Sequence, residues 1–315
     1  MVSSLTALFK LFIIILIIAC LFFMIKKFCK RNLRGIIISV VVLAVLVILF
    51  FLPNYIKNLP IRAKELNYNE SSNSKTLTIA TEGAYYPWNY VTSSGNPEGF
   101  DVDIAKEIAK RMNLSPKFVI IPFQSLITNL SNKQYDMVVS SMSITDERSH
   151  NVDFSIPYVQ VLVTFFGKKD IFSKYKNADL GTLKKVLKNK TIGTQSGTTW
   201  PLYLNKEFAE IIKVKYYATQ PQLMMEVKSG RIDAGFSETP SVVEFIKENS
   251  NVVMFGPTLG IKDSPIFGKG IAVAVAKGNT ELLDKINQAL KSMHEDGTIK
   301  ALSIKYFGTD ISYGQ

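Results

Sequence analysis

Apolar strand patterns alternate with helical patterns from about residue 75 to the end of this chain. Leu77–Tyr90 begins as a short alternating strand and runs into a loop, and Gly99–Asp103 opens a segment whose apolar residues recur at helical spacing. Further strand patterns lie at Tyr135–Val139 and Thr191–Thr194, each before a helix start. This alternation predicts an α/β fold with largely parallel sheets. A chain of 315 residues is long enough for two globular units.

Two apolar runs precede this part of the chain, at residues 11–25 and 36–52, and the segment between them, Lys26–Arg34, carries five positive charges. Basic loops stay on the cytoplasmic side, and a membrane span needs about 20 apolar residues. We therefore expect one or two transmembrane helices within residues 1–56, followed by a polar tether at 57–74. The soluble part is expected on the periplasmic side of a bacterial inner membrane.

Retention of this N-terminal anchor is expected because no small-residue cleavage site follows Leu52. Two alternatives stay open. Read from Met24, the chain begins like an export signal, which would give a cleaved periplasmic form. The residues up to Cys20 loosely resemble a lipoprotein cleavage box, but apolar residues follow where a lipoprotein has a polar tether, so we expect an ordinary thiol.

Charge and composition argue against several classes of partner. The formal net charge is +11, but six of the positive charges precede Pro53 and the remainder form no basic cluster, so a nucleic-acid partner is not expected. The two cysteines, Cys20 and Cys29, lie in the N-terminal region, and His150 and His294 stand apart. We therefore expect neither a metal site nor a cofactor.

The run Ser140–Arg148 places small hydroxyl residues at the end of an apolar strand, with an arginine within one helical turn. The planar fork of Arg148 can bind a carboxylate through two parallel hydrogen bonds. This arrangement suits a small anion-bearing ligand better than a reaction. Taken alone, an N-capped helix with Ser143 or Thr145 as the cap and Arg148 exposed is an equal alternative.

Four segments occur in a specific order: Leu77–Tyr90, Gly99–Asp103, Ser140–Arg148 and Val152–Tyr158. Together they closely resemble the periplasmic amino-acid-binding proteins of bacterial ABC importers (solute-binding protein family 3), above all those for lysine/arginine/ornithine, histidine and glutamine. The resemblance runs from about residue 75 to 313. It implies a type II periplasmic-binding-protein fold with two lobes, of residues 75–161 plus 258–315 and of residues 162–257. It also implies a binding protein, not an enzyme, that delivers an amino acid to a permease.

The resemblance further implies which residues hold the α-carboxylate and α-ammonium groups of the ligand. Arg148 and Ser143 would bind the carboxylate, and Ser141 would bind the ammonium together with Glu238, where relatives carry an aspartate. A helix start at Ser196–Thr199 would face Arg148 and add N–H donors. Thr198 and Thr199 are the candidates there, and N-capping of the helix would use the same groups.

The side chain of the ligand would lie between the rings of Tyr85 and Phe123, with Glu82 at its far end and Ser140 and Gln195 nearby. Glu82 disfavours acidic ligands, so arginine, lysine or ornithine is favoured, while glutamine, histidine and cystine remain open.

Three aromatic and acidic residues close to this site have structural alternatives. A place in the core is the minor alternative for Phe123, and Trp88 is expected to pack beneath the site. We expect Asp101 to cap the following helix rather than to contact the ligand.

Two other functions occur on the same scaffold. A cyclohexadienyl dehydratase would turn over its substrate in the cleft, but no acid/base pair is evident beyond the binding acids Glu82 and Glu238. A sensor domain would be joined to an output module. We expect a binding protein rather than either of these.

Overall fold

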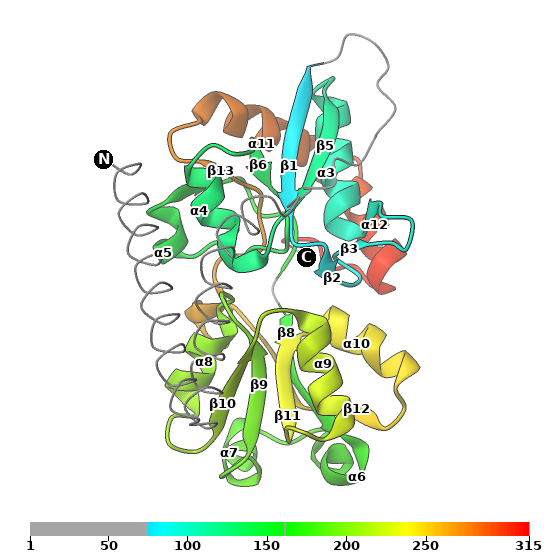
Figure 1. Cartoon of the computed structure of the whole chain (residues 1–315), viewed down its shortest axis with the longest axis vertical. Helices are drawn as coiled ribbons and strands as arrows, with labels where there is room; N and C mark the ends of the chain where they lie inside the picture. Colours follow the sequence, from blue (N-terminus) through cyan, green and yellow to red (C-terminus); the bar gives the residue numbers. More distant parts are fainter. Residues whose placement is uncertain (1–74, 161, 315) are drawn as a thin grey trace, which may run out of the picture. The chain divides into compact units, whose positions relative to one another are not determined.

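The computed structural model describes residues 75–160 and 162–314 (Figure 1). The expected membrane region at 1–56, with Cys20 and Met24, and the expected tether at 57–74 lie outside the described residues. Within the described part, no helix is long and apolar enough to cross a membrane.

The first sheet has the strand order β5-β1-β6-β13-β7. Its strands are β1 (Thr76–Thr81), β5 (Ser115–Ile120), β6 (Met137–Val138), β7 (Val152–Phe154) and β13 (Ala274–Ala276). Strand β1 runs parallel to β5 and β6, whereas β13 is antiparallel to β6 and β7. The helices connected with it are α3 (Phe100–Arg111), α4 (Leu126–Ser131), α5 (Asp146–Ser149), α11 (Thr280–Glu295) and α12 (Thr298–Phe307). We call these elements the first lobe, together with the short sheet β2 (Ala84–Tyr85), β3 (Asn89–Val91) and β4 (Pro97–Glu98).

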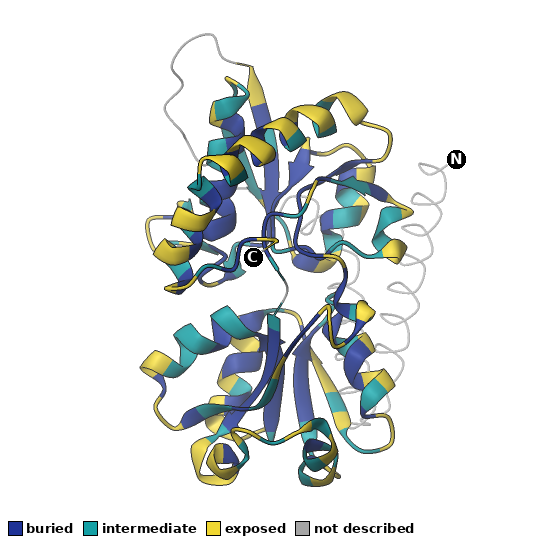
Figure 2. Cartoon of the chain, turned by 180° about the vertical axis from the view of Figure 1, so that it is seen from behind, coloured by how far each residue is buried: buried dark blue, intermediate teal, exposed yellow. Residues whose placement is uncertain are grey.

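The second sheet has the strand order β10-β9-β11-β8-β12. Its strands are β8 (Leu162–Lys168), β9 (Thr191–Gln195), β10 (Lys213–Tyr217), β11 (Ala234–Glu238) and β12 (Val252–Gly260). The helices α6 (Lys169–Phe172), α7 (Leu180–Val186), α8 (Trp200–Glu207), α9 (Gln220–Ser229) and α10 (Thr239–Glu248) accompany it, and we call this set the second lobe. Both lobes belong to one compact unit. In each, the central strands are largely buried, whereas the edge strands β5 and β10 and the outer helix faces are more exposed (Figure 2).

The predicted α/β class is confirmed, and so is the expectation of largely parallel sheets: in each five-stranded sheet four strands run in one direction and a single strand runs against them. In the second sheet β9 runs parallel to β10 and β11, whereas β8 is antiparallel to β11 and β12. The first sheet likewise contains the antiparallel strand β13. Strand β8 is the first strand of the second sheet after the chain leaves the first sheet, and β13 is the first strand of the first sheet after the chain returns. Because each follows a strand of the other sheet, no helical crossover within its own sheet requires it to run parallel to its neighbours.

Helix α3 packs into the first lobe through one apolar face and follows directly after a glycine. Its inward face carries Val102, Ile104, Ala105, Ile108 and Ala109, all fully buried, at the spacing of one helix face. Gly99 precedes it with φ 119°, and a Cβ there would lie 2.4 Å from the carbonyl oxygen of Trp88. Only glycine fits this entry to the helix.

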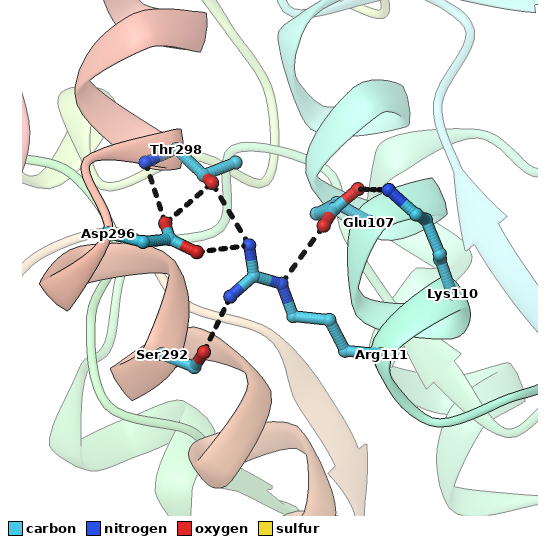
Figure 3. Close-up of polar contacts among 6 residues, drawn as sticks. All are labelled: Glu107, Lys110, Arg111, Ser292, Asp296 and Thr298. Atoms are coloured by element: carbon cyan, nitrogen blue, oxygen red, sulfur yellow. Dashed lines mark hydrogen bonds and ion pairs between the residues drawn. The ribbon is translucent and has the colours of Figure 1, made fainter.

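At its far end, α3 is fastened to the C-terminal helices by Arg111 (Figure 3). The guanidinium donates to Glu107 at 3.0 Å, Ser292 at 2.6 Å, Asp296 at 2.7 Å and Thr298 at 3.0 Å. We call this group the Arg111 cluster. Because it joins α3, α11 and α12, it stabilises the first lobe at the end of α3 opposite to Asp101.

Candidate functional site

The candidate residues stand where strands of the two sheets end. Glu82 follows β1, Ser140 and Ser141 come shortly after β6, Gln195 is the last residue of β9 and Glu238 the last of β11. Strands β1 and β6 are parallel, as are β9 and β11. Their carboxyl ends therefore meet at one edge of each sheet, which is where α/β folds hold ligands.

Glu238 connects the second lobe to the first through both of its carboxylate oxygens. The Tyr85 hydroxyl donates to Oε2 at 2.7 Å, and Ser141 Oγ lies 3.0 Å from the same oxygen and 3.2 Å from Oε1. The side chain is buried, with 2% of its surface exposed, and burial raises its pKa to about 8. Both donors are neutral hydroxyls, so no charge of theirs opposes a cation, and in its ionised form this carboxyl group has the hydrogen-bonding capacity and charge to hold an ammonium.

Glu82 and Gln195 form a second bond between the lobes. Gln195 Nε2 donates to Glu82 Oε1 at 2.7 Å, and both side chains are buried. Removal from water raises the pKa of Glu82 to about 7, an effect that the Gln195 hydrogen bond partly opposes. The Ser140 hydroxyl accepts from the main-chain N–H of Glu82 at 3.0 Å, so Ser140 fixes the backbone beside this carboxyl group.

Arg148 lies in α5 and reaches the second lobe. Its Nη1 donates to the carbonyl oxygen of Ser143 at 2.8 Å and its Nη2 to that of Gly197 at 2.9 Å. The guanidinium carbon lies 5.7 Å from the centre of the Phe123 ring. Burial lowers the pKa of Arg148 to about 10, so the group stays charged at neutral pH. Thr145, not Ser143, caps the helix, and Arg148 is half-buried rather than exposed as the alternative required.

The segment before α8 faces Arg148 from the second lobe. Thr198 Oγ1 donates to the carbonyl oxygen of Gln195 at 2.7 Å. Thr199 is the residue before α8, but its hydroxyl makes no capping bond and has no hydrogen-bond partner among the described residues, although it is buried. Simple N-capping therefore does not account for either threonine side chain.

The candidate residues form two groups, and only the first group lines a cavity of about 780 Å³. It is lined by Arg148, Gly197, Thr198 and Thr199, with apolar walls that include Leu202. The second group, which does not line it, makes the contacts between lobes described above and consists of Glu82, Tyr85, Gln195 and Glu238.

Asp101 does not cap α3, and that expectation is wrong. Gly99 occupies the capping position, and Asp101 lies in the first turn with its side chain fully buried. It accepts hydrogen bonds from Asn89 Nδ2 at 2.8 Å and from the Tyr158 hydroxyl at 2.7 Å, and burial raises its pKa to about 7. Sequence reasoning missed both partners, although Tyr158 ends one of the four segments on which the resemblance rests.

The two remaining aromatic residues have clear positions. Trp88 is fully buried and stacks on Tyr85 with ring centres 6.4 Å apart, so the structural interpretation is confirmed. Phe123 packs in a small cluster with Leu126 and Leu130, while its ring also lies beneath Arg148. The core and the site interpretations of Phe123 are thus compatible.

Comparison with known proteins gives consistent matches. Residues 77–309 match the family model of bacterial extracellular solute-binding proteins, family 3. The arginine-binding periplasmic protein of Mannheimia haemolytica is 37% identical over 231 residues, covering 73% of this chain and 90% of that protein. The histidine-binding periplasmic protein of Escherichia coli (strain K12) is 32% identical over 244 residues, covering 76% and 90%.

Solved structures extend these matches to the fold. An ancestral arginine-binding protein bound to glutamine matches with a TM-score of 0.65 and 34% identity, over 75% of this chain and 99% of that one. The predicted resemblance and the two-lobed α/β fold of periplasmic binding proteins are thereby confirmed. The relatives described here are binding proteins rather than enzymes.

Proposed function

The chain belongs to the bacterial extracellular solute-binding proteins of family 3, and we propose that it captures a basic amino acid between its two lobes and delivers it to an ABC transporter permease. Arginine, lysine and ornithine are the favoured ligands. The observation that carries this proposal is the pair of buried carboxyl groups, Glu82 and Glu238, each held by neutral partners, in a site with the cationic Arg148. Arginine would bring two cationic groups and one anionic group to these three residues.

In this proposal the ligand backbone binds through six hydroxyl and charged residues. The carboxylate pairs with Arg148 and takes donors from Ser143, Thr198 and Thr199, and the ammonium binds Glu238 and Ser141. Thr199 has a buried hydroxyl without a partner among the described residues, which supports its place in this set.

The side chain of the ligand then extends toward Glu82 and Gln195, beside Ser140, between the rings of Tyr85 and Phe123. Aromatic faces attract cations and pack against an aliphatic stem, so these rings favour a long basic side chain. The buried Glu82 opposes an acidic side chain, because repulsion between like charges is poorly screened away from water.

Capture would require the lobes to close around the ligand. We place the first lobe at residues 75–161 plus 258–315 and the second at 162–257, because the candidate residues divide between two separate sheets joined by two chain crossings. The boundary at 257/258 falls at the irregularity within β12, whose last residues still pair with β8 of the second sheet. Ligand contacts from both sides favour the closed form. Small-angle scattering should show compaction on addition of arginine, whereas an unchanged profile at saturation would contradict closure.

We further propose that the protein acts on the periplasmic side of the inner membrane, held there by residues 1–56. The apolar runs at 11–25 and 36–52 and the basic segment Lys26–Arg34 support this topology. Mass spectrometry of the mature N-terminus tests it, since a fragment beginning after about Leu52 would reveal a cleaved signal instead.

A thermal-shift screen of the full chain with the twenty amino acids, ornithine and citrulline tests the binding proposal. Basic amino acids should raise the unfolding temperature most, because a ligand that binds the folded state stabilises it by mass action. Prephenate serves as the control for the dehydratase alternative and should be recovered unchanged. A screen in which glutamate stabilises most, or in which no amino acid stabilises, would contradict the proposed function.

A further inference from the structure

We propose that Glu82, paired with Gln195, selects between cationic and neutral amide side chains by changing its protonation state. The inference rests on the proposed function and deepens it. It assigns to one residue the ability to accept two chemical classes of ligand, arginine-like and glutamine-like, at the same position. The choice between them then depends on pH.

The contacts of Glu82 make this exchange feasible. Its Oε1 accepts from the neutral amide of Gln195 at 2.7 Å, only 5% of its surface is exposed, and it makes no ion pair with any described residue. A buried carboxyl group with only a neutral partner is not locked in the charged form. The burial that raises its pKa to about 7 supports the same conclusion.

The two protonation states present opposite hydrogen-bonding polarity to the end of a ligand side chain. The ionised carboxylate accepts from a guanidinium or ammonium group and balances its charge. The protonated form donates its O–H to the carbonyl oxygen of an amide or ureido group, as in glutamine or citrulline. The proton is exchanged with solvent, so arginine binding releases it and glutamine binding takes it up.

Gln195 keeps the site usable in both states. Its Nε2 also lies 3.4 Å from the carbonyl oxygen of Ala218, so its amide is held from β9 and from the end of β10 as well as by Glu82. Because the amide is neutral, it neither repels a cationic ligand nor fixes the charge of Glu82. A lysine or arginine in place of Gln195 would hold Glu82 ionised permanently.

The effect of Glu82 on the pH dependence must be distinguished from the effects of the other titratable groups of the site. They are Tyr85 on β2, Asp101 on α3, Arg148 on α5, Tyr158 after β7 and Glu238 on β11. In the proposed pose, Glu238 and Arg148 contact the ammonium and carboxylate, which arginine and glutamine share. Their titration therefore affects both ligands alike and cancels in the ratio of the two affinities.

The test is calorimetric titration of the full chain with arginine and with glutamine at several values between about pH 6 and about pH 8. If each ligand binds one form of Glu82, the ratio of the arginine to the glutamine association constant rises about tenfold per pH unit, or about 100-fold over this range. In Glu82→Gln the ratio should be independent of pH. The control Glu281→Gln, at a side chain that is 83% exposed, should retain the native dependence.

A second readout uses the native protein alone, so it does not depend on the folding of a variant. Titrations near pH 7 in buffers of different ionisation enthalpy count the protons exchanged. Arginine should release more protons than glutamine, by up to about one per ligand. A ratio that is flat with pH, an equal proton count for the two ligands, or an unchanged pH dependence in Glu82→Gln would overturn the switch and leave the proposed function intact. Failure of both ligands to bind at any pH would instead contradict the proposed function itself.

Discussion

Replacing Arg148 by alanine removes the guanidinium that, in the proposed function, pairs with the ligand carboxylate. The native guanidinium is already oriented, because Nη1 bonds to the Ser143 carbonyl, Nη2 bonds to the Gly197 carbonyl and the group lies over the Phe123 ring. An oriented planar fork binds a carboxylate with little further loss of side-chain freedom. We therefore expect Arg148→Ala to weaken arginine binding strongly while the protein remains folded.

The size of the effect follows from the position of the group. Truncating one partner of a buried charged pair costs about 2–5 kcal/mol, and Arg148 is half-buried, so we take about 2–3 kcal/mol. At about 1.4 kcal/mol for each factor of ten, this loss raises the dissociation constant for arginine roughly 30- to 150-fold. Arg148→Lys should recover part of the loss, because the charge remains but an ammonium cannot form two parallel hydrogen bonds.

Calorimetric titration of arginine into the full chain measures the effect, with circular dichroism to verify the fold. Arg231→Ala is the matched control, since that arginine also pairs with a carboxylate but its side chain is 61% exposed on the second lobe. Its removal should leave the affinity unchanged. An Arg148→Ala variant that is folded and binds arginine within about twofold of the native affinity would refute the reasoning.

Three further predictions concern the site and the fold. Glu238→Gln should weaken arginine binding by about 2 kcal/mol or more, because an amide cannot balance the ammonium charge; native affinity in calorimetry would place the ammonium elsewhere. Arg111→Ala should lower the unfolding free energy by about 1–3 kcal/mol through the loss of the Arg111 cluster (Figure 3) and leave the arginine affinity unchanged. A weaker affinity would indicate coupling to the site. Thr298 and Arg111 lower the pKa of Asp296 to about 2, so its contribution to stability should persist above the ordinary carboxyl pKa and disappear as the pH falls toward 2. Acid titration of unfolding should therefore show a smaller loss of stability in Asp296→Asn than in the native protein, and equal losses would contradict this.

The sequence was sufficient for the fold class and the family, because both depend on local patterns. Strand and helix periodicity predicted the α/β class, and four ordered segments carried the resemblance that the family match confirms. The directions of β8 and β13 were not predictable in this way. They depend on how the chain enters each sheet from the other one, which no local pattern records.

The candidate site was predicted as a set of residues but not as a set of contacts. Tyr85 and Glu238 are 153 residues apart in sequence, and their hydrogen bond exists only because the two lobes meet. Asp101 was assigned to helix capping on local grounds, whereas Asn89 and Tyr158 hold it in the interior. The prediction for Asp101 was wrong because tertiary partners override the local preference of an aspartate for capping positions. The ligand roles of the site residues stay predictions.

A crystal structure of the chain grown with L-arginine tests the central claim most directly. We expect one arginine between the lobes, with its carboxylate on Arg148, its ammonium on Glu238 and its guanidinium beside Glu82. Arginine bound away from these three residues, or an empty site at saturating arginine, would contradict the claim.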